Sequence, residues 1–76
     1  MPKFPVLSDR DVIKALEKAG FTLVKQRGSH AKLRKVAAEG KKTAIVPLKP
    51  VIRTGTMKSI LRQSHLTPEE FIELLQ

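Results

Sequence analysis

The chain of 76 residues is long enough for one domain with a small core, and its lack of cysteine excludes a disulfide framework, a thiolate zinc site and a cysteine nucleophile. No apolar run approaches the roughly 20 residues of a membrane span, and the N-terminus has no apolar signal-peptide core, so we expect a cytoplasmic protein without a membrane partner. Fifteen Lys and Arg against seven Asp and Glu give a formal net charge of +8, which favours a polyanionic partner.

The N-terminal part of the chain predicts an extended lead-in followed by a helix. Two prolines within residues 1–7 favour extended backbone, so the single domain over 1–76 has its body at 8–76. Ser8 and Asp11 have the spacing of a capping box, and Gly20 stands where a helix C-terminus favours glycine. Between them lies one apolar stripe at helical spacing, formed by Val12, Ile13, Leu16 and Ala19. We therefore expect a helix over 9–19.

Three short strands are predicted next, over 21–26, 30–36 and 43–48. Gly28-Ser29 indicates a turn between the first two, and a loop over 37–42 containing Glu39-Gly40 separates the second from the third. Pro47 cannot donate a ladder hydrogen bond, so it belongs at a strand end or on an edge strand. In the second strand, side chains alternate between two faces, which places Ala31 and Leu33 on one face and His30, Lys32 and Arg34 on the other.

Two helices complete the predicted fold. After a loop over 49–54, a helix begins near Gly55 or Thr56 with Thr54 as its N-cap. Its inward face is formed by Met57, Ile60, Leu61 and Ser64, and its outward face carries Lys58 and Arg62. His65 then ends the helix, and Thr67-Pro68-Glu69-Glu70 has the cap, proline and glutamate that open another. The order α-β-β-β-α-α predicts an α+β domain in which helices cover one face of a three-stranded antiparallel sheet and leave the other face open and basic.

The basic residues are concentrated in the middle of the chain. From Lys25 to Arg62 there are eleven basic residues and one acid, Glu39. A solvated basic face is the simplest interpretation, but a stretch of one sign this long favours a polyanion. Because the chain has three Phe and no Trp or Tyr, a stacking platform for single strands is not expected, and recognition of a nucleic-acid backbone fits the composition better.

Few residues are available for catalysis. Glu69, Glu70 and Glu73 are better explained as partners of the N-terminal dipole of the last helix and as a solvated face. The two histidines show no metal-ligand spacing with the acids, so we expect neither a metal nor a small-molecule cofactor. His65 is expected to cap the preceding helix.

His30 is the remaining candidate for catalysis. It follows a tight turn, and Lys32 and Arg34 on its face attract phosphate. A histidine beside a phosphodiester can move the proton of an RNA 2′-hydroxyl, which is the chemistry of a ribonuclease. From these residues alone, an incidental surface histidine is the simpler interpretation. Ser29 is expected to have a turn or capping role and to orient His30.

Several segments, taken in order and spacing, resemble the HicA (YcfA-like) family of toxins. They are Gly20-Phe21, Arg27-Gly28-Ser29-His30, Val46-Pro47, Gly55-Thr56-Met57-Lys58-Ser59-Ile60-Leu61-Arg62-Gln63 and Leu66-Thr67-Pro68-Glu69-Glu70-Phe71. The resemblance covers nearly the whole chain from Ser8 onward. The Gly-Ser-His turn alone is a weak motif, but joined to the Gly-Thr-Met block in a basic chain of this length it is specific.

The resemblance implies a fold similar to a double-stranded-RNA-binding domain and the activity of a metal-independent mRNA endoribonuclease that arrests translation in the cytoplasm. It implies that His30 is the catalytic histidine and that a HicB-type antitoxin is the partner. Together with the charge pattern, this leads us to expect an RNA-binding set around His30, made of Lys25, Arg27, Ser29, Lys32, Arg34, Lys58 and Arg62.

Two alternatives are weighed against a ribonuclease. Many HicA-like chains have a histidine soon after the Val-Pro of the third strand, where this chain has Leu48 and Lys49, and this difference favours a non-catalytic RNA-binding module that still binds an antitoxin. DNA binding is the other alternative, but the helix that begins near Gly55 turns its apolar residues inward and is not an obvious recognition helix.

Overall fold

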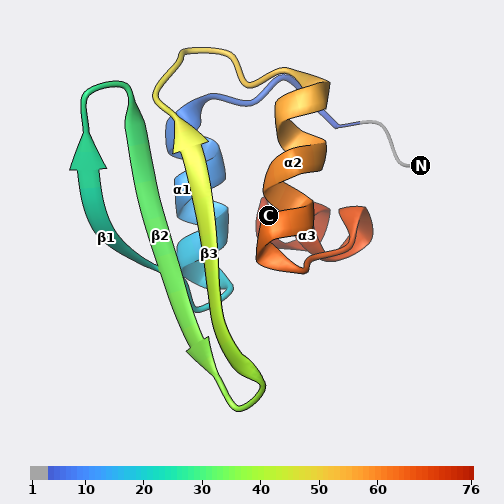
Figure 1. Cartoon of the computed structure of the whole chain (residues 1–76). Coiled ribbons are helices and arrows are strands. Elements are labelled where there is room, and N and C mark those ends of the chain that lie inside the picture. The colour runs from blue at the N-terminus through green and yellow to red at the C-terminus, as the bar shows by residue number, and fades with distance from the viewer. Residues whose placement is uncertain (1–3) are drawn as a thin grey trace.

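The structure is a computed structural model that describes residues 4–76, and it shows six elements in the predicted order (Figure 1). They are α1 (Asp9–Lys18), β1 (Thr22–Arg27), β2 (His30–Ala37), β3 (Gly40–Pro47), α2 (Thr54–Ser64) and α3 (Pro68–Leu74). The strands form one antiparallel sheet in the order β1-β2-β3. The predicted α+β fold, similar to a double-stranded-RNA-binding domain, is confirmed. Of the expected lead-in over 1–7, residues 1–3 lie outside the described part.

The hairpin between β2 and β3 is tighter than the sequence predicts. Ala37 pairs with Gly40, so β3 begins at Gly40 and not at Thr43, and the expected loop over 37–42 is reduced to a two-residue turn. Gly40 has φ 124°, a conformation that favours glycine, and this lets the chain reverse without a longer loop. Lys41 therefore lies in the sheet. Pro47 is the last residue of β3, as predicted for a residue that cannot donate to the ladder.

The helix caps agree with the sequence except at α2. Ser8 caps α1 in a capping box with Asp11, and Thr67 caps α3 in one with Glu70. The prediction that Thr54 caps α2 is wrong. Thr54 is already helical, the N-cap is Arg53 in extended conformation, and no side chain bonds to this helix end. At the other end of α2, His65 takes the left-handed conformation, with φ 59°, as expected for its C-cap.

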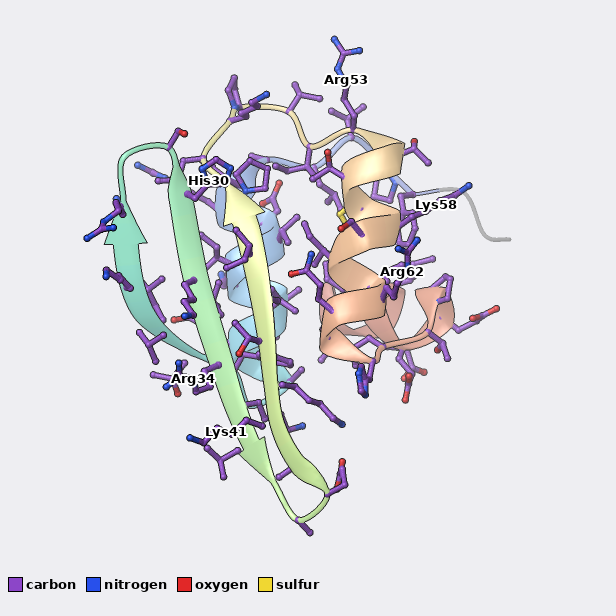
Figure 2. All side chains as sticks on the ribbon, in the orientation of Figure 1. His30, Arg34, Lys41, Arg53, Lys58 and Arg62 are labelled. Carbon is purple, nitrogen blue, oxygen red and sulfur yellow. The ribbon has the colours of Figure 1, made fainter. Side chains whose placement is uncertain are left out.

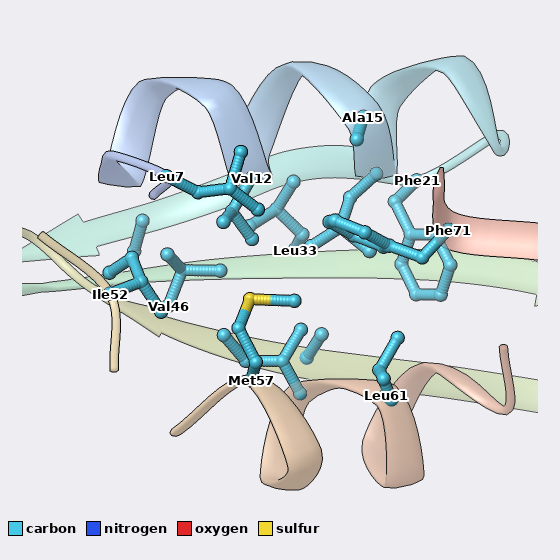
Figure 3. Packing of buried hydrophobic residues seen from close by; sticks show 14 residues of the cluster. Leu7, Val12, Ala15, Phe21, Leu33, Val46, Ile52, Met57, Leu61 and Phe71 are labelled. Carbon is cyan, nitrogen blue, oxygen red and sulfur yellow. The ribbon is translucent and has the colours of Figure 1, made fainter. Parts of the chain in front are cut away.

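The core lies between the sheet and the three helices (Figure 3). The alternation predicted for β2 is confirmed, because Ala31 and Leu33 are fully buried together with Ala44 and Val46 of β3. The inward face predicted for α2 is also confirmed. Further core residues are Leu7, Val12, Ala15, Leu16, Phe21, Ile52, Met57, Ile60, Leu61 and Phe71. The lead-in contributes to this core, since Leu7 bridges to Ile52 and the Phe4 ring meets Phe71 edge to face.

Helix α2 lies along the β3 edge of the sheet (Figure 1). The backbone N–H of Ile45 donates to Gln63 Oε1 at 2.9 Å, and Gln63 Nε2 donates to Ser59 Oγ at 3.0 Å. One N–H of the β3 edge is therefore satisfied by a helix side chain, and the helix beside this edge hinders pairing with another strand. The opposite edge, β1, has all six of its residues exposed.

Candidate nucleic-acid interface

The sheet face turned away from the helices, here called the open face, carries the predicted site. Residues that are paired across neighbouring strands project from the same face of the sheet, so the register shows which residues share the open face. Arg27 pairs with His30, and His30 pairs with Pro47. Lys25 pairs with Lys32, and Thr22 pairs with Arg34. The members are Thr22, Lys25, Arg27, His30, Lys32, Arg34, Val36, Lys41, Thr43, Ile45 and Pro47. None of these side chains is acidic. The open face is thus a cationic surface with one histidine.

A β-bulge brings Lys25 onto the open face. Leu23 pairs with Leu33, but the next pair is Lys25 with Lys32, so Val24 is an extra residue in β1. Without it, strict alternation from Leu23 would turn Lys25 toward the helices. The bulge thus adds one cation to the open face that a period of two does not predict.

His30 is the first residue of β2 and is exposed at one end of the open face (Figure 2). Its Nδ1 lies 3.1 Å from Ser29 Oγ. Ser29 is itself held in place, because its carbonyl accepts the backbone N–H of Leu48 at 2.7 Å. When Nδ1–H donates to Ser29, the lone pair of the neutral imidazole is on Nε2, away from Ser29, where it can accept a proton. The predicted role of Ser29 beside His30 is consistent with this geometry.

The cations of the open face have no acidic partner within residues 4–76. The ion pair that the described residues form joins Lys42 and Glu39 at 2.9 Å, in the β2–β3 hairpin, and the Lys42 hydrogen bond holds the pKa of Glu39 below its ordinary value. Lys42 pairs with Lys35, so it belongs to the other face of the sheet. Cations that no protein carboxylate neutralises give the open face a positive potential that attracts polyanions.

Lys35 shows that not every basic residue in the middle of the chain serves this surface. Its side chain is on the covered side, where Nζ donates to the carbonyl of Ala19 at 2.7 Å and lies 6.0 Å from the centre of the Phe21 ring. An ammonium at the C-terminal end of α1 satisfies a free carbonyl and meets the negative end of the helix dipole. Lys35 therefore stabilises the fold.

Lys58 and Arg62 are exposed on α2, as predicted, but they do not join the open face. Each immediately precedes a residue that faces the β3 edge, Ser59 or Gln63, and one residue turns a helix by about 100°. Their side chains project from α2 on the side away from the sheet (Figure 2). The predicted site therefore divides into the open face with Lys25, Arg27, Ser29, His30, Lys32 and Arg34, and a separate helix flank with Lys58 and Arg62.

A groove of about 780 Å³ lies between the lead-in and the loop before α2. Val6, Val51 and Met57 supply apolar walls, and Lys49 and Arg53 add positive charge. His30 does not line it. The candidate histidine lies on an exposed surface, which suits a ligand as large as a nucleic-acid strand.

The family model for the HicA toxin of bacterial toxin–antitoxin systems matches residues 10–66. The chain belongs to the HicA toxin family. The resemblance seen in the sequence is thereby confirmed, and this HicA protein is the toxin of a toxin–antitoxin pair, which implies an antitoxin partner. No curated protein matches the chain. In the described part of this HicA toxin, no helix is long and apolar enough to cross a membrane, and no three His, Cys, Asp or Glu gather where they could hold a metal ion.

Proposed function

We propose that this HicA toxin is a metal-independent mRNA endoribonuclease in which His30 moves the reacting proton. One observation carries the proposal: the single histidine of the open face is exposed among five cations, with no acid on that face. A phosphodiester held there lies within reach of an imidazole. RNA provides the nucleophile as its own 2′-hydroxyl, so the protein has to supply only positioning, charge and proton transfer.

The proposed reaction begins when Nε2 of His30 accepts the proton of the 2′-hydroxyl. The 2′-oxygen then bonds to the adjacent phosphorus, and the bond from phosphorus to the 5′-oxygen breaks. The imidazolium or water returns a proton to the departing 5′-oxygen, which leaves a 2′,3′-cyclic phosphate and a 5′-hydroxyl. Charge on the phosphorane is stabilised by the cations nearest to His30, which are Arg27 in the opposite strand and Lys32 two residues along.

Ser29 has a positioning role in this proposal. Its carbonyl accepts the backbone N–H of Leu48, and its hydroxyl lies at hydrogen-bond distance from Nδ1 of His30, so Ser29 orients the imidazole ring. The more distant open-face cations Lys25 and Arg34 bind phosphates. Lys58 and Arg62 on the helix flank hold RNA only where a long or folded molecule wraps round the β3 edge.

The proposed partner is a HicB-type antitoxin that covers the open face in the cytoplasm. A chain of net charge +8 whose open-face cations lack protein carboxylates offers complementary charge to an acidic protein surface as well as to RNA. Occupation of the open face by a protein would keep mRNA from His30.

The test is inducible expression of the wild type and of His30→Ala in a bacterium, with growth and total mRNA integrity as readouts. The proposal expects growth arrest and mRNA loss with the wild type alone. Because His30 is exposed, the variant should fold, and its accumulation as folded protein is the control. If neither protein affects mRNA, this HicA chain is a non-catalytic binder, and Lys49 in place of a second histidine becomes the first position to examine.

A further inference from the structure

The open face has a second cluster at its far end, formed by Arg34 and Lys41. Figure 2 shows them near each other toward the β2–β3 hairpin, with His30 at the opposite end of the sheet. Lys41 pairs with Val36, two residues beyond Arg34 on the same face of β2. It reaches this place because β3 begins at Gly40. The tight hairpin therefore extends the cationic surface beyond the residues that the sequence predicts.

Strand geometry gives the separation between the two ends. At about 3.3 Å per residue, Arg34 lies roughly 13 Å along β2 from His30, and the pair formed by Val36 and Lys41 lies roughly 20 Å away. Phosphates of one strand in a nucleic-acid duplex are spaced by roughly 3.4 Å along the axis, and those of an extended single strand lie farther apart, so these lengths span at most about four and about six phosphates. The far cluster is too distant to contact the phosphate at His30.

Arg34 is placed for binding and has no partner of its own. Its Nε is buried yet forms no hydrogen bond, the one such side-chain atom within residues 4–76. Its cross-strand neighbours on the open face are Thr22 and Thr43, which are neutral. Covering the base of the guanidinium restricts its motion and lowers the entropy lost when its free end binds an anion. Lys41 is exposed, and no carboxylate of the described residues pairs with it.

We propose that Arg34 and Lys41 form a distal anchor for the RNA backbone, which binds phosphates a few positions away from the one cleaved at His30. The inference rests on the proposed ribonuclease function and deepens it. It specifies a substrate that extends along β2 on one side of the cleaved bond, and it assigns to Lys41 a role that its sequence context does not show. Short RNA reaches His30 without using the anchor, whereas longer RNA uses both.

The test compares two double variants, each of which removes two positive charges. Arg34→Gln with Lys41→Gln removes the anchor. Arg10→Gln with Lys14→Gln removes two exposed cations from α1, which covers the other face of the sheet. In a His30→Ala background, binding of an RNA of about 16 nucleotides is measured against salt concentration. The anchor variant should lower the slope of log affinity against log salt by about 1.5, since each lost phosphate contact removes roughly 0.7 to 0.9, and the α1 variant should leave that slope unchanged.

RNA cleavage by the same variants tests whether the anchor lies beyond the reach of a short RNA bound at His30. With His30 intact, the anchor variant should lose about tenfold more kcat/KM on the long RNA than on an RNA of about four nucleotides cut at its centre. Lys41→Gln alone should lower the slope of log affinity against log salt by about half as much. Because Lys41 is exposed near the hairpin, this single variant should fold and serves as the control should the double variant misfold. Equal salt slopes for the two double variants would reject the anchor and leave the ribonuclease intact. Absence of RNA binding by any variant would reject both proposals.

Discussion

The two faces of the sheet differ in what their side chains do, although they come from the same three strands. On the covered face, Ala31, Leu33, Ala44 and Val46 have no exposed surface and form the floor of the core. On the open face, His30, Lys32 and Arg34 alternate with those residues, and His30 is exposed while Lys32 and Arg34 are half-buried. A period of two therefore separates, within one strand, the residues that form the core from the residues proposed to bind RNA. Substitutions on one face should therefore alter folding, and substitutions on the other should alter ligand binding.

The largest expected effect follows from truncating the covered face. Leu33→Ala removes a fully buried side chain and should lower the free energy of unfolding by about 2–5 kcal/mol, a large part of the total for a domain of this size. Lys32→Ala, one residue earlier and on the open face, should change it by less than about 0.5 kcal/mol. Urea unfolding followed by circular dichroism measures both. Similar losses in the two variants would contradict the division between the faces.

A smaller effect is expected from removing the Ser29 hydroxyl that lies beside the His30 ring. Ser29→Ala removes the hydroxyl that lies 3.1 Å from Nδ1 and should reduce kcat of RNA cleavage about twofold to tenfold, the value of one hydrogen bond. Ser29→Thr, which keeps a hydroxyl at this position, should retain most of the activity. Thr43→Ala, elsewhere on the open face, is the matched control. Equal losses in Ser29→Ala and Ser29→Thr would show that Ser29 shapes the turn and does not position the imidazole.

The smallest expected effect is a loss of fold stability at low pH, and it involves carboxyl groups that lie outside the open face. The pKa values of Asp11 and Glu70 are lowered chiefly by hydrogen bonds from the backbone N–H groups of Ser8 and Thr67, and that of Glu39 by Lys42. A carboxyl with a lowered pKa in the folded state stabilises the fold above its unfolded pKa and loses this contribution as pH falls through the folded value. Thermal unfolding should therefore occur at lower temperature below about pH 4. Replacing Asp11 with Asn and Glu70 with Gln should flatten this dependence, and an unchanged pH dependence would contradict it.

Sequence patterns predicted the elements of the fold because each one rests on local chemistry. Ser8 with Asp11 and Thr67 with Glu70 have capping-box spacing, and the apolar stripes have helical or alternating periods. The errors come from features that local patterns do not contain. Whether Gly40 ends a loop or begins a strand depends on the register with Ala37, and the start of α2 depends on how the loop after β3 returns to the core.

The sequence indicated most residues of the candidate site, but it did not show how all of them are arranged in space. Alternation placed His30, Lys32 and Arg34 together, and the register confirms that they share a face. It could not show that the bulge at Val24 turns Lys25 to the same face or that the hairpin carries Lys41 there. The separation of Lys58 from the sheet follows from the contact between Gln63 and Ile45, a tertiary hydrogen bond with no sequence signal.

The most direct test of the account is cleavage by purified protein of one RNA and of the DNA strand with the same sequence, with His30→Ala beside the wild type. We expect the wild type to cleave RNA alone and to leave 2′,3′-cyclic phosphate ends, and we expect His30→Ala to cleave about 10²- to 10⁴-fold more slowly while unfolding at the same urea concentration. Equal cleavage of DNA would contradict attack by the 2′-hydroxyl, and a folded His30→Ala protein with wild-type activity would contradict the assignment of catalysis to the open face.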